Sequence, residues 1–176
     1  MKYAKIRKCD VANGPGVRVS LFVSGCTRRC KGCFNKEAWD FNYGTELNEE
    51  KQAELIDALS PHYIKGLSVL GGEPFEIQNQ KGLVPVVKKV KEKYPDKKIW
   101  CYSGYSFDKD ILGDMAKKYD ETNELLKYVD FLVDGEFKEE LKNPSLRFRG
   151  SSNQRIIDVQ QSLKNNEIVL WEEENT

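Results

Sequence analysis

The sequence predicts an α/β protein whose mainly parallel sheet forms an open, partial (β/α) barrel. From Val17 onward, short apolar runs alternate with stretches of helical periodicity, a pattern typical of parallel strands joined by right-handed helical crossovers. The 176 residues suit one domain of ordinary size, so we expect a single domain over residues 1–176. They are too few for a closed barrel of eight β/α units, which takes about 250 residues.

The composition narrows the classes of protein that fit this chain. It carries 28 basic and 28 acidic side chains and a formal net charge of zero, so it lacks the basic excess of a nucleic-acid-binding surface. The first ten residues contain no apolar leader segment, and no apolar run has membrane-spanning length. The five cysteines are an odd number with three clustered, unlike a secreted disulfide framework. We therefore expect a cytoplasmic protein that binds neither nucleic acid nor membrane.

The first half of the chain contains two predicted strands and one predicted helix. Residues Met1–Val11 are mixed in character and are expected to form a short edge segment. Val17–Val23 alternates and is predominantly apolar, which predicts the first strand. Asn48 is predicted to cap a helix that runs to about Leu59. The short apolar run Gly66–Leu70 is the second predicted strand.

In the second half, helical spacing predicts a helix around Leu83–Val90, in which Pro85 is tolerated only near the start. The other expected elements are, in order, a third strand at Lys98–Tyr102, an amphipathic helix at Ile111–Tyr119, a short helix near Glu124–Lys127, a fourth strand at Tyr128–Val133, strands at Arg155–Val159 and Glu167–Trp171, and a solvated tail at Glu172–Glu174.

The most informative stretch is Gly25–Asn35, here called the cysteine loop, in which Cys26, Cys30 and Cys33 have the spacing C-x3-C-x2-C. Three thiolates so close in sequence converge on one point only if the backbone wraps around it, for example around a soft metal or a cluster. The loop begins where the first predicted strand ends, which is where ligands bind in parallel α/β folds. The basic residues within the loop lower thiol pKa values and suit an anionic cluster.

Three interpretations of the cysteine loop remain open from the residues alone. A structural zinc site normally has four ligands, but Cys9 and Cys101 are distant in the sequence and His62, the single histidine, is more simply solvated or packed. A [4Fe–4S] cluster normally has four thiolate ligands, so three would leave one iron open to a substrate. The third interpretation is a surface loop whose cysteines are incidental.

Three further strand ends carry candidate binding residues. Gly71-Gly72-Glu73-Pro74 follows the second strand, where the glycines allow close approach of a ligand and Glu73 can accept a charge-assisted hydrogen bond from an ammonium group. A plain turn with a surface glutamate is the alternative. Ser103 follows the third strand and Asp134 ends the fourth; Asp134 could reach a ribose or amino group, or could simply be a turn residue.

Taken together, these motifs resemble the radical S-adenosylmethionine (SAM) superfamily, and within it the family of activating proteins of anaerobic ribonucleoside-triphosphate reductases. The resemblance covers most of the chain and rests on the cysteine loop and on the segments Asn13-Gly14-Pro15-Gly16-Val17-Arg18, Trp39-Asp40, Gly71-Gly72-Glu73-Pro74, Tyr102-Ser103-Gly104-Tyr105, Val133-Asp134-Gly135-Glu136-Phe137 and Arg147-Phe148-Arg149-Gly150-Ser151-Ser152-Asn153-Gln154.

The resemblance implies a barrel of the radical SAM type and a reaction. A [4Fe–4S] cluster would be held by Cys26, Cys30 and Cys33, with the fourth iron open to SAM. One electron, from a donor such as flavodoxin or ferredoxin, would split SAM and lead to a glycyl radical on the large subunit of the reductase. No catalytic side chain beyond the cluster and SAM is expected. The residues expected to contact SAM are Gly32, Cys33, Phe34, Gly72, Glu73, Ser103 and Asp134.

Two rival functions share much of this pattern. An activating enzyme of another glycyl-radical enzyme would match everything up to the arginine-rich motif that begins at Arg147. From a different class, a non-enzymatic iron–sulfur or zinc module could sense redox state or bind a partner, although Glu73 and the open ligand count argue against it. Within Leu146–Asn153, the aromatic ring between Arg147 and Arg149 has the composition of an interface anchor. We hypothesise that this segment contacts the reductase or lies at the mouth of the site, where it would line the path of the glycine loop; a solvated surface is the alternative.

Overall fold

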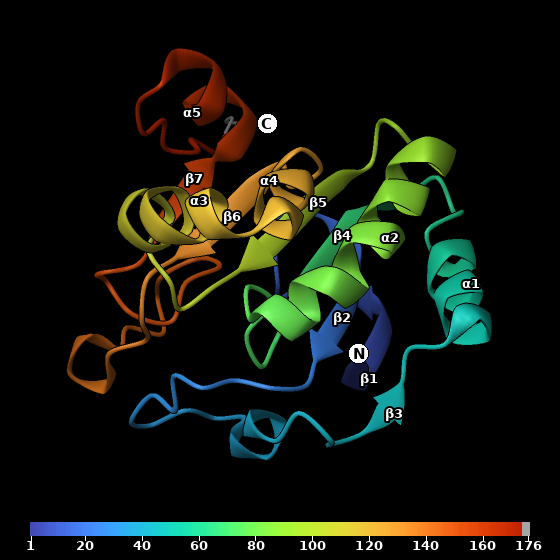
Figure 1. Ribbon diagram of the computed structural model, residues 1–176, viewed down its shortest axis with the longest axis horizontal. Helices are drawn as coiled ribbons and strands as arrows, with labels where there is room; N and C mark the ends of the chain where they lie inside the picture. The colour runs from blue at the N-terminus through green and yellow to red at the C-terminus, as the bar shows by residue number, and fades with distance from the viewer. Residues whose placement is uncertain (174–176) are drawn as a thin grey trace.

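The computed structural model describes residues 1–173, and its centre is a seven-stranded sheet in the order β3-β1-β2-β4-β5-β6-β7 (Figure 1). The strands are β1 Lys2–Asp10, β2 Val17–Val23, β3 Thr45–Glu46, β4 Ile64–Gly71, β5 Lys98–Tyr102, β6 Phe131–Asp134 and β7 Arg155–Asp158. The helices are α1 Glu49–Ala58, α2 Ile77–Lys93, α3 Ala116–Lys118, α4 Asp120–Leu126 and α5 Val159–Asn165, with 3-10 turns at Lys36–Trp39 and Glu139–Leu141 and a π-helical stretch at Phe107–Met115.

The sheet is mixed, which corrects the expectation of a mainly parallel one. The central strands β2, β4, β5 and β6 pair in parallel, as the alternation of strands and helices predicts. At one side β1 pairs antiparallel with both β2 and β3, and at the other side β7 pairs antiparallel with β6. No described strand joins β3 to β7, so the sheet is open, as expected, and its outer pairs are antiparallel.

Several predicted boundaries agree closely with the structure. The strands at Val17–Val23 and Lys98–Tyr102 have the predicted ends. The side chain of Asn48 caps α1 by accepting a hydrogen bond from the backbone N–H of Lys51 at 2.9 Å. Pro85 was expected only near a helix start, but it lies inside α2, because that helix begins two turns earlier, at Ile77.

The two ends of the chain differ from expectation. The N-terminal segment is the full strand β1, and it lies inside the sheet, because the two-residue strand β3 forms the edge beyond it. Helix α5 was not predicted. Glu167–Trp171 forms only an isolated bridge between Leu170 and Ile157, and Glu174 lies outside the described residues.

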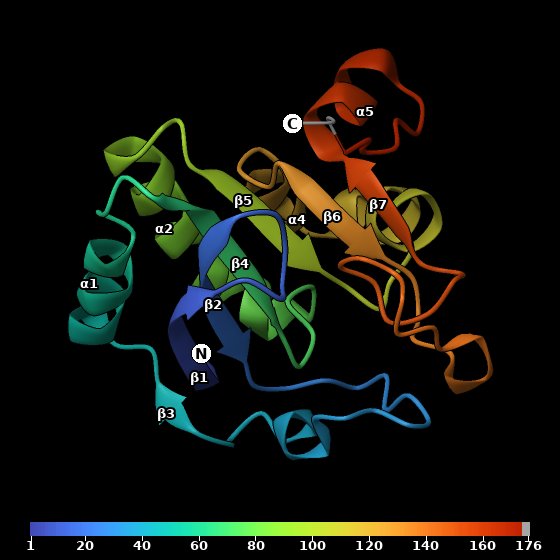
Figure 2. The ribbon, with the colours of Figure 1, turned by 180° about the vertical axis from the view of Figure 1, so that it is seen from behind.

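Helices α1, α2, α3 and α4 cover one face of the sheet, as Figure 1 shows from the front and Figure 2 from behind. The opposite face is closed by loops. Arg18 of β2 is 2% exposed there and donates hydrogen bonds to the hydroxyl of Ser68 and to the carbonyls of Pro15, Leu67 and Lys98. None of the helices in residues 1–173 is long and apolar enough to cross a membrane.

Candidate functional site

Two long loops meet at one end of the sheet. The loop after β2, which contains the cysteines, and the segment after β6 lie beside each other in both ribbon views (Figures 1 and 2). Between them and the ends of β4 and β5 lies a cavity of about 370 Å³, here called the inner cavity. Its volume is within the usual range of about 300–1,000 Å³ for small-molecule sites. The residues that matter most among its lining are Cys26, Arg28, Cys30, Cys33, Gly72, Glu73, Ser103 and Arg149.

The first half of the cysteine loop is fastened to the body of the protein by hydrogen bonds. The backbone N–H of Gly25 donates to the carbonyl of Ala38 at 2.8 Å, and that of Cys26 donates to the carbonyl of Trp39 at 3.2 Å. The backbone N–H and the hydroxyl of Thr27 both donate to Oε1 of Glu76, at 2.7 and 2.6 Å. The loop therefore starts from a fixed position above the N-terminus of α2.

All three loop cysteines are free, partly buried and part of the wall of the inner cavity. Burial raises the pKa of Cys26, against the lowering effect of the backbone amides of Arg28 and Arg29. Burial likewise raises the pKa of Cys30, against the lowering effects of the Arg28 charge and of the backbone amide of Phe137. Within residues 1–173, no group of three Cys, His, Asp or Glu side chains stands ready-made to hold a metal ion, so the three sulfurs share a cavity without meeting at one point.

These residues fit an iron–sulfur cluster. The donor set consists of thiols alone, which is the ligand type that such clusters take. The amide N–H groups directed at two of the sulfurs would stabilise thiolates, since hydrogen bonds to a charged group favour its charged form. The chain thus supplies three soft ligands and donors around them in one cavity.

Among residues 1–173, Glu73 is the one carboxylate that lines the inner cavity, and it is 2% exposed. Its Oε1 accepts from the N–H of Phe75 at 2.9 Å and from the hydroxyl of Ser103 at 2.8 Å, and its Oε2 accepts from the N–H of Gly104 at 2.7 Å. Burial raises the pKa of Glu73 to about 7, against the lowering effect of these donors. A cationic group in the cavity would favour the charged carboxylate.

Gly72 is needed for close backbone packing beside Glu73. A Cβ atom at position 72 would lie 2.5 Å from the carbonyl oxygen of Gly25 and 2.8 Å from that of Ala38, closer than real contacts allow. The backbone N–H of Gly72 donates to the carbonyl of Val23 at 2.8 Å. The glycine thus joins the ends of β2 and β4, from which the cysteine loop and Glu73 begin.

The structure brings most of the sequence-predicted site residues to the inner cavity but excludes one. Those that line it are Cys26, Gly32, Cys30, Cys33, Phe34, Gly72, Glu73 and Ser103. Asp134 was expected to reach the cofactor; it is 1% exposed, does not line the cavity and is already paired. It accepts hydrogen bonds from the Arg155 guanidinium and, at 2.7 Å, from the N–H of Phe107. Asp134 therefore has a structural position here.

The segment Lys142–Gln154, here called the late segment, forms a wall of the inner cavity, which agrees with the second of its two expected roles, a position at the mouth of the site. Phe148 was expected to anchor a partner, but its ring packs against Trp100 and Trp171, with centroids 5.6 and 6.2 Å away. Arg149 instead lines the cavity. The arginine-rich composition marked this segment, but nothing in the sequence distinguished the three positions.

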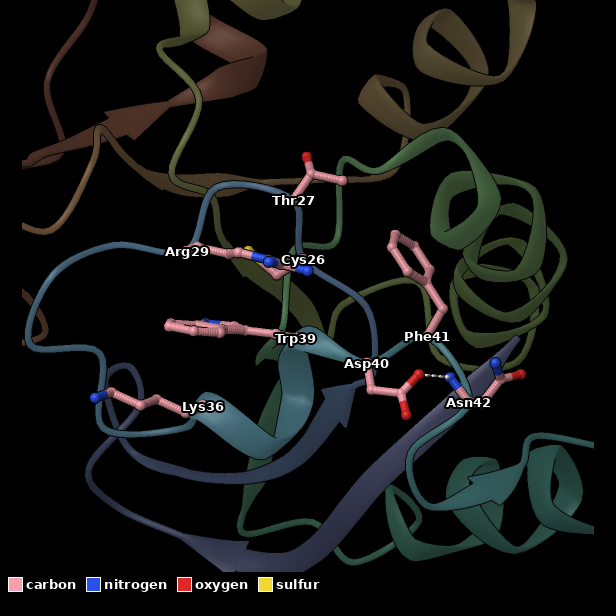
Figure 3. A pocket seen from close by; sticks show the side chains of 8 residues that line it. All are labelled: Cys26, Thr27, Arg29, Lys36, Trp39, Asp40, Phe41 and Asn42. Atoms are coloured by element: carbon pink, nitrogen blue, oxygen red, sulfur yellow. Dashed lines mark hydrogen bonds between the residues drawn. The ribbon is translucent and has the colours of Figure 1, made fainter.

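A second, larger cleft of about 760 Å³ lies on the outer side of the cysteine loop (Figure 3). Figure 3 shows the Arg29 side chain lying over the ring of Trp39, with its guanidinium 6.0 Å from the ring centroid. Lys36, Asp40 and Phe41 complete much of its lining. Cys26 and Trp39 line both this cleft and the inner cavity, so these two residues form the wall between them.

Comparison with known proteins agrees with this site. Residues 12–157 match the family model described as a 4Fe-4S single cluster domain, and the match spans the cysteine loop and the whole late segment. Anaerobic ribonucleoside-triphosphate reductase-activating proteins are similar over 89% of this chain: that of Pasteurella multocida is 39% identical over 96% of its length, that of Enterobacteria phage T4 40% over 93%, and that of Escherichia coli K12 37% over 97%. The chain therefore belongs to the family of anaerobic ribonucleoside-triphosphate reductase-activating proteins.

Proposed function

We propose that the chain is a radical SAM enzyme that cleaves SAM reductively at a [4Fe–4S] cluster and generates a glycyl radical on the large subunit of an anaerobic ribonucleoside-triphosphate reductase. The observation that carries the proposal is the shared inner cavity, in which three free cysteines and the buried carboxylate of Glu73 line one space. An external electron donor, such as flavodoxin or ferredoxin, and a single domain over residues 1–176 are parts of the same proposal.

The ligand count supports a cluster with one open iron. Cys26, Cys30 and Cys33 would hold three irons, and neither of the other two cysteines could serve as the fourth ligand from its present position. Cys9 is exposed on β1, whereas Cys101 is 2% exposed within the core of the sheet. When bound, the cluster and SAM supply the electron transfer and the radical chemistry.

The side chains of this protein would bind and orient the cofactors. Glu73 would accept the ammonium group of the methionine moiety of SAM, and the hydroxyl of Ser103 would hold the carboxylate in place through its 2.8 Å hydrogen bond. Gly32 and Phe34 of the cysteine loop and Gly72, directly after β4, would contact the same ligand from their positions in the cavity wall. No side chain is assigned a role as general acid or base.

The test replaces each cysteine by alanine in protein reconstituted with iron and sulfide under anaerobic conditions. Cys26→Ala, Cys30→Ala and Cys33→Ala should each abolish 5′-deoxyadenosine release from SAM under a chemical reductant, since each removes one cluster ligand. Cys9→Ala is the matched control and should retain full iron content and activity, as should Cys101→Ala in the fraction that folds. If any of the variants at Cys26, Cys30 or Cys33 keeps the cluster and cleaves SAM, the ligand assignment is contradicted.

The reductase step needs a separate assay. Active protein mixed with the anaerobic reductase and SAM should produce the electron paramagnetic resonance signal of a glycyl radical on the reductase. If the protein cleaves SAM but produces no such signal, the result would support the radical SAM chemistry and contradict the anaerobic reductase as the partner.

A further inference from the structure

Arg149 of the late segment lines the inner cavity, and the proposed function assigns it no role. The guanidinium of Arg149 donates one hydrogen bond, from Nη1 to the carbonyl of Gln154 at 2.8 Å, and within residues 1–173 it has no other hydrogen bond or ion pair. Its Nε is buried and has no hydrogen-bond partner among these described residues. A guanidinium has five N–H donors, so most of the donor capacity of Arg149 is unused in a partly enclosed space.

The backbone around Arg149 is fixed, so this position is not that of a loose surface side chain. Oε1 of Gln154 accepts from the N–H groups of Gly150 and Ser151 at 2.9 and 3.1 Å, and its Nε2 donates to the carbonyl of Gly135 at 2.9 Å. Gln154 thereby ties the late segment to the end of β6. Its own carbonyl then orients the arginine.

Phe148 explains why the two neighbouring arginines point to different places. Its backbone has a positive φ of 60°, and its ring is held against Trp100. Arg147, on one side of this turn, is exposed and forms an ion pair with Glu173, while its guanidinium lies 4.9 Å from the Phe148 ring centroid. Arg149, on the other side, lines the inner cavity.

The charges that line the inner cavity match a zwitterion. In the part of the chain that the structure describes, Glu73 is its one acidic residue, and its basic residues are Arg28, Lys142 and Arg149. Arg28 already lies over the ring of Tyr105 and within 3.5 Å of a carboxylate oxygen of Glu136. Among the arginines of the cavity, Arg149 is therefore the one without a described carboxylate partner.

We propose that Arg149 binds the α-carboxylate of the methionine moiety of SAM, while Glu73 takes the ammonium group of the same moiety. Arginine suits this role because its planar fork matches the two oxygens of a carboxylate. The assignment rests on the proposed function and adds to it a residue that discriminates between ligands with and without a carboxylate.

The experiment measures binding without turnover. Cluster-loaded, oxidised protein without reductase is titrated with SAM and with decarboxylated SAM, and dissociation constants are determined by equilibrium dialysis. Arg149→Gln should weaken SAM binding about tenfold to a hundredfold, the size expected for lost hydrogen bonds to a charged group. Its affinity for decarboxylated SAM should stay within about twofold of the wild-type value, because this ligand lacks the group that Arg149 holds.

Arg147→Gln is the matched control: it makes the same chemical change two residues away, outside the cavity, and should leave both affinities unchanged. Iron content and melting temperature are measured first. If Arg149→Gln fails to load the cluster, Arg149→Lys is measured instead, since it keeps the charge but loses the planar fork. SAM binding that is several-fold weaker, with unchanged affinity for decarboxylated SAM, supports the proposal. Unchanged SAM affinity in Arg149→Lys overturns it.

The remaining outcomes separate this inference from the function on which it rests. Wild-type protein that binds no SAM would refute the proposed function itself. Wild-type binding with equal SAM affinity in Arg149→Gln would refute only the role of Arg149. A variant that keeps its SAM affinity but no longer activates the reductase would place Arg149 against a group of the protein partner, and would overturn the proposal equally.

Discussion

Phe148 offers a stability test that separates a packed aromatic ring from an interface anchor. The ring is half-buried against Trp100 and Trp171. A fully buried Phe→Ala change costs about 3–5 kcal/mol, so a half-buried ring should cost about 2 kcal/mol in the free energy of unfolding of Phe148→Ala. At a slope of about 2 kcal/mol per molar urea, the unfolding midpoint should fall by about 1 M.

The positive φ of 60° at Phe148 makes Phe148→Gly a sharper second test. Glycine loses the ring as alanine does, but it removes the left-handed strain of about 1–2 kcal/mol that an L-residue carries there. Its greater freedom in the unfolded chain costs about 0.4–1 kcal/mol. Phe148→Gly should therefore be more stable than Phe148→Ala by roughly 0.5–1 kcal/mol, the reverse of the usual order in helices and strands.

The assay is urea unfolding of the cluster-free protein followed by tryptophan fluorescence, because Trp100 and Trp171 both lie against the ring. Tyr63→Ala is the control, since this aromatic side chain is 49% exposed and should cost less than about 0.5 kcal/mol. A glycine variant less stable than the alanine variant would refute the backbone assignment. If the alanine and glycine variants both keep wild-type stability but no longer activate the reductase, the result would support the alternative that Phe148 contacts the partner.

Two carboxylates of the site give further predictions. Glu73→Ala should retain the cluster but bind SAM about tenfold to a hundredfold more weakly, the loss expected for one charge-assisted hydrogen bond. Normal SAM affinity in the cluster-loaded variant would contradict the role of Glu73 as acceptor for the ammonium group. Glu76→Ala should lose iron to a chelator faster than wild type, because Thr27 loses its acceptor for two hydrogen bonds. Glu76→Gln keeps an acceptor oxygen and should lose iron at the wild-type rate; equal rates in all three proteins would show that Glu76 does not hold the loop.

The central strands could be predicted because their sequences are short, predominantly apolar runs. The burial of both faces of β2 could not be predicted in this way, since Arg18 and Ser20, opposite Val19 and Leu21, are polar but buried. The direction of the outer strands could not be predicted in this way. Strand β1 has mostly exposed or partly exposed residues, so its pattern resembles a surface segment, and its place inside the sheet depends on the two-residue strand β3.

The candidate site was predictable where the residues lie in one local motif. The cysteine loop and Glu73 follow strands whose ends were predicted, so their meeting at one edge of the sheet could be expected. Asp134 shows where this reasoning failed. Because β7 runs antiparallel to β6, Arg155 lies directly opposite Asp134, and this cross-strand partner occupies the carboxylate. Without the direction of β7, nothing in the sequence indicated that Asp134 was already paired.

The antiparallel return of β7 also bears on how a protein substrate could reach the inner cavity. β7 follows directly after the late segment, so the pairing of β7 with β6 holds the C-terminal end of that segment near the end of β6. The late segment then stands as a wall of the cavity, opposite the cysteine loop, where a closed barrel would have further strands. Under the proposed function, a glycine of the reductase would have to enter the cavity, and the ordering of such a peptide costs free energy that contacts around the cavity have to offset. Exposed residues of the cavity wall, such as Phe34 at 89% exposure, are therefore the first positions at which contacts with the reductase should be sought.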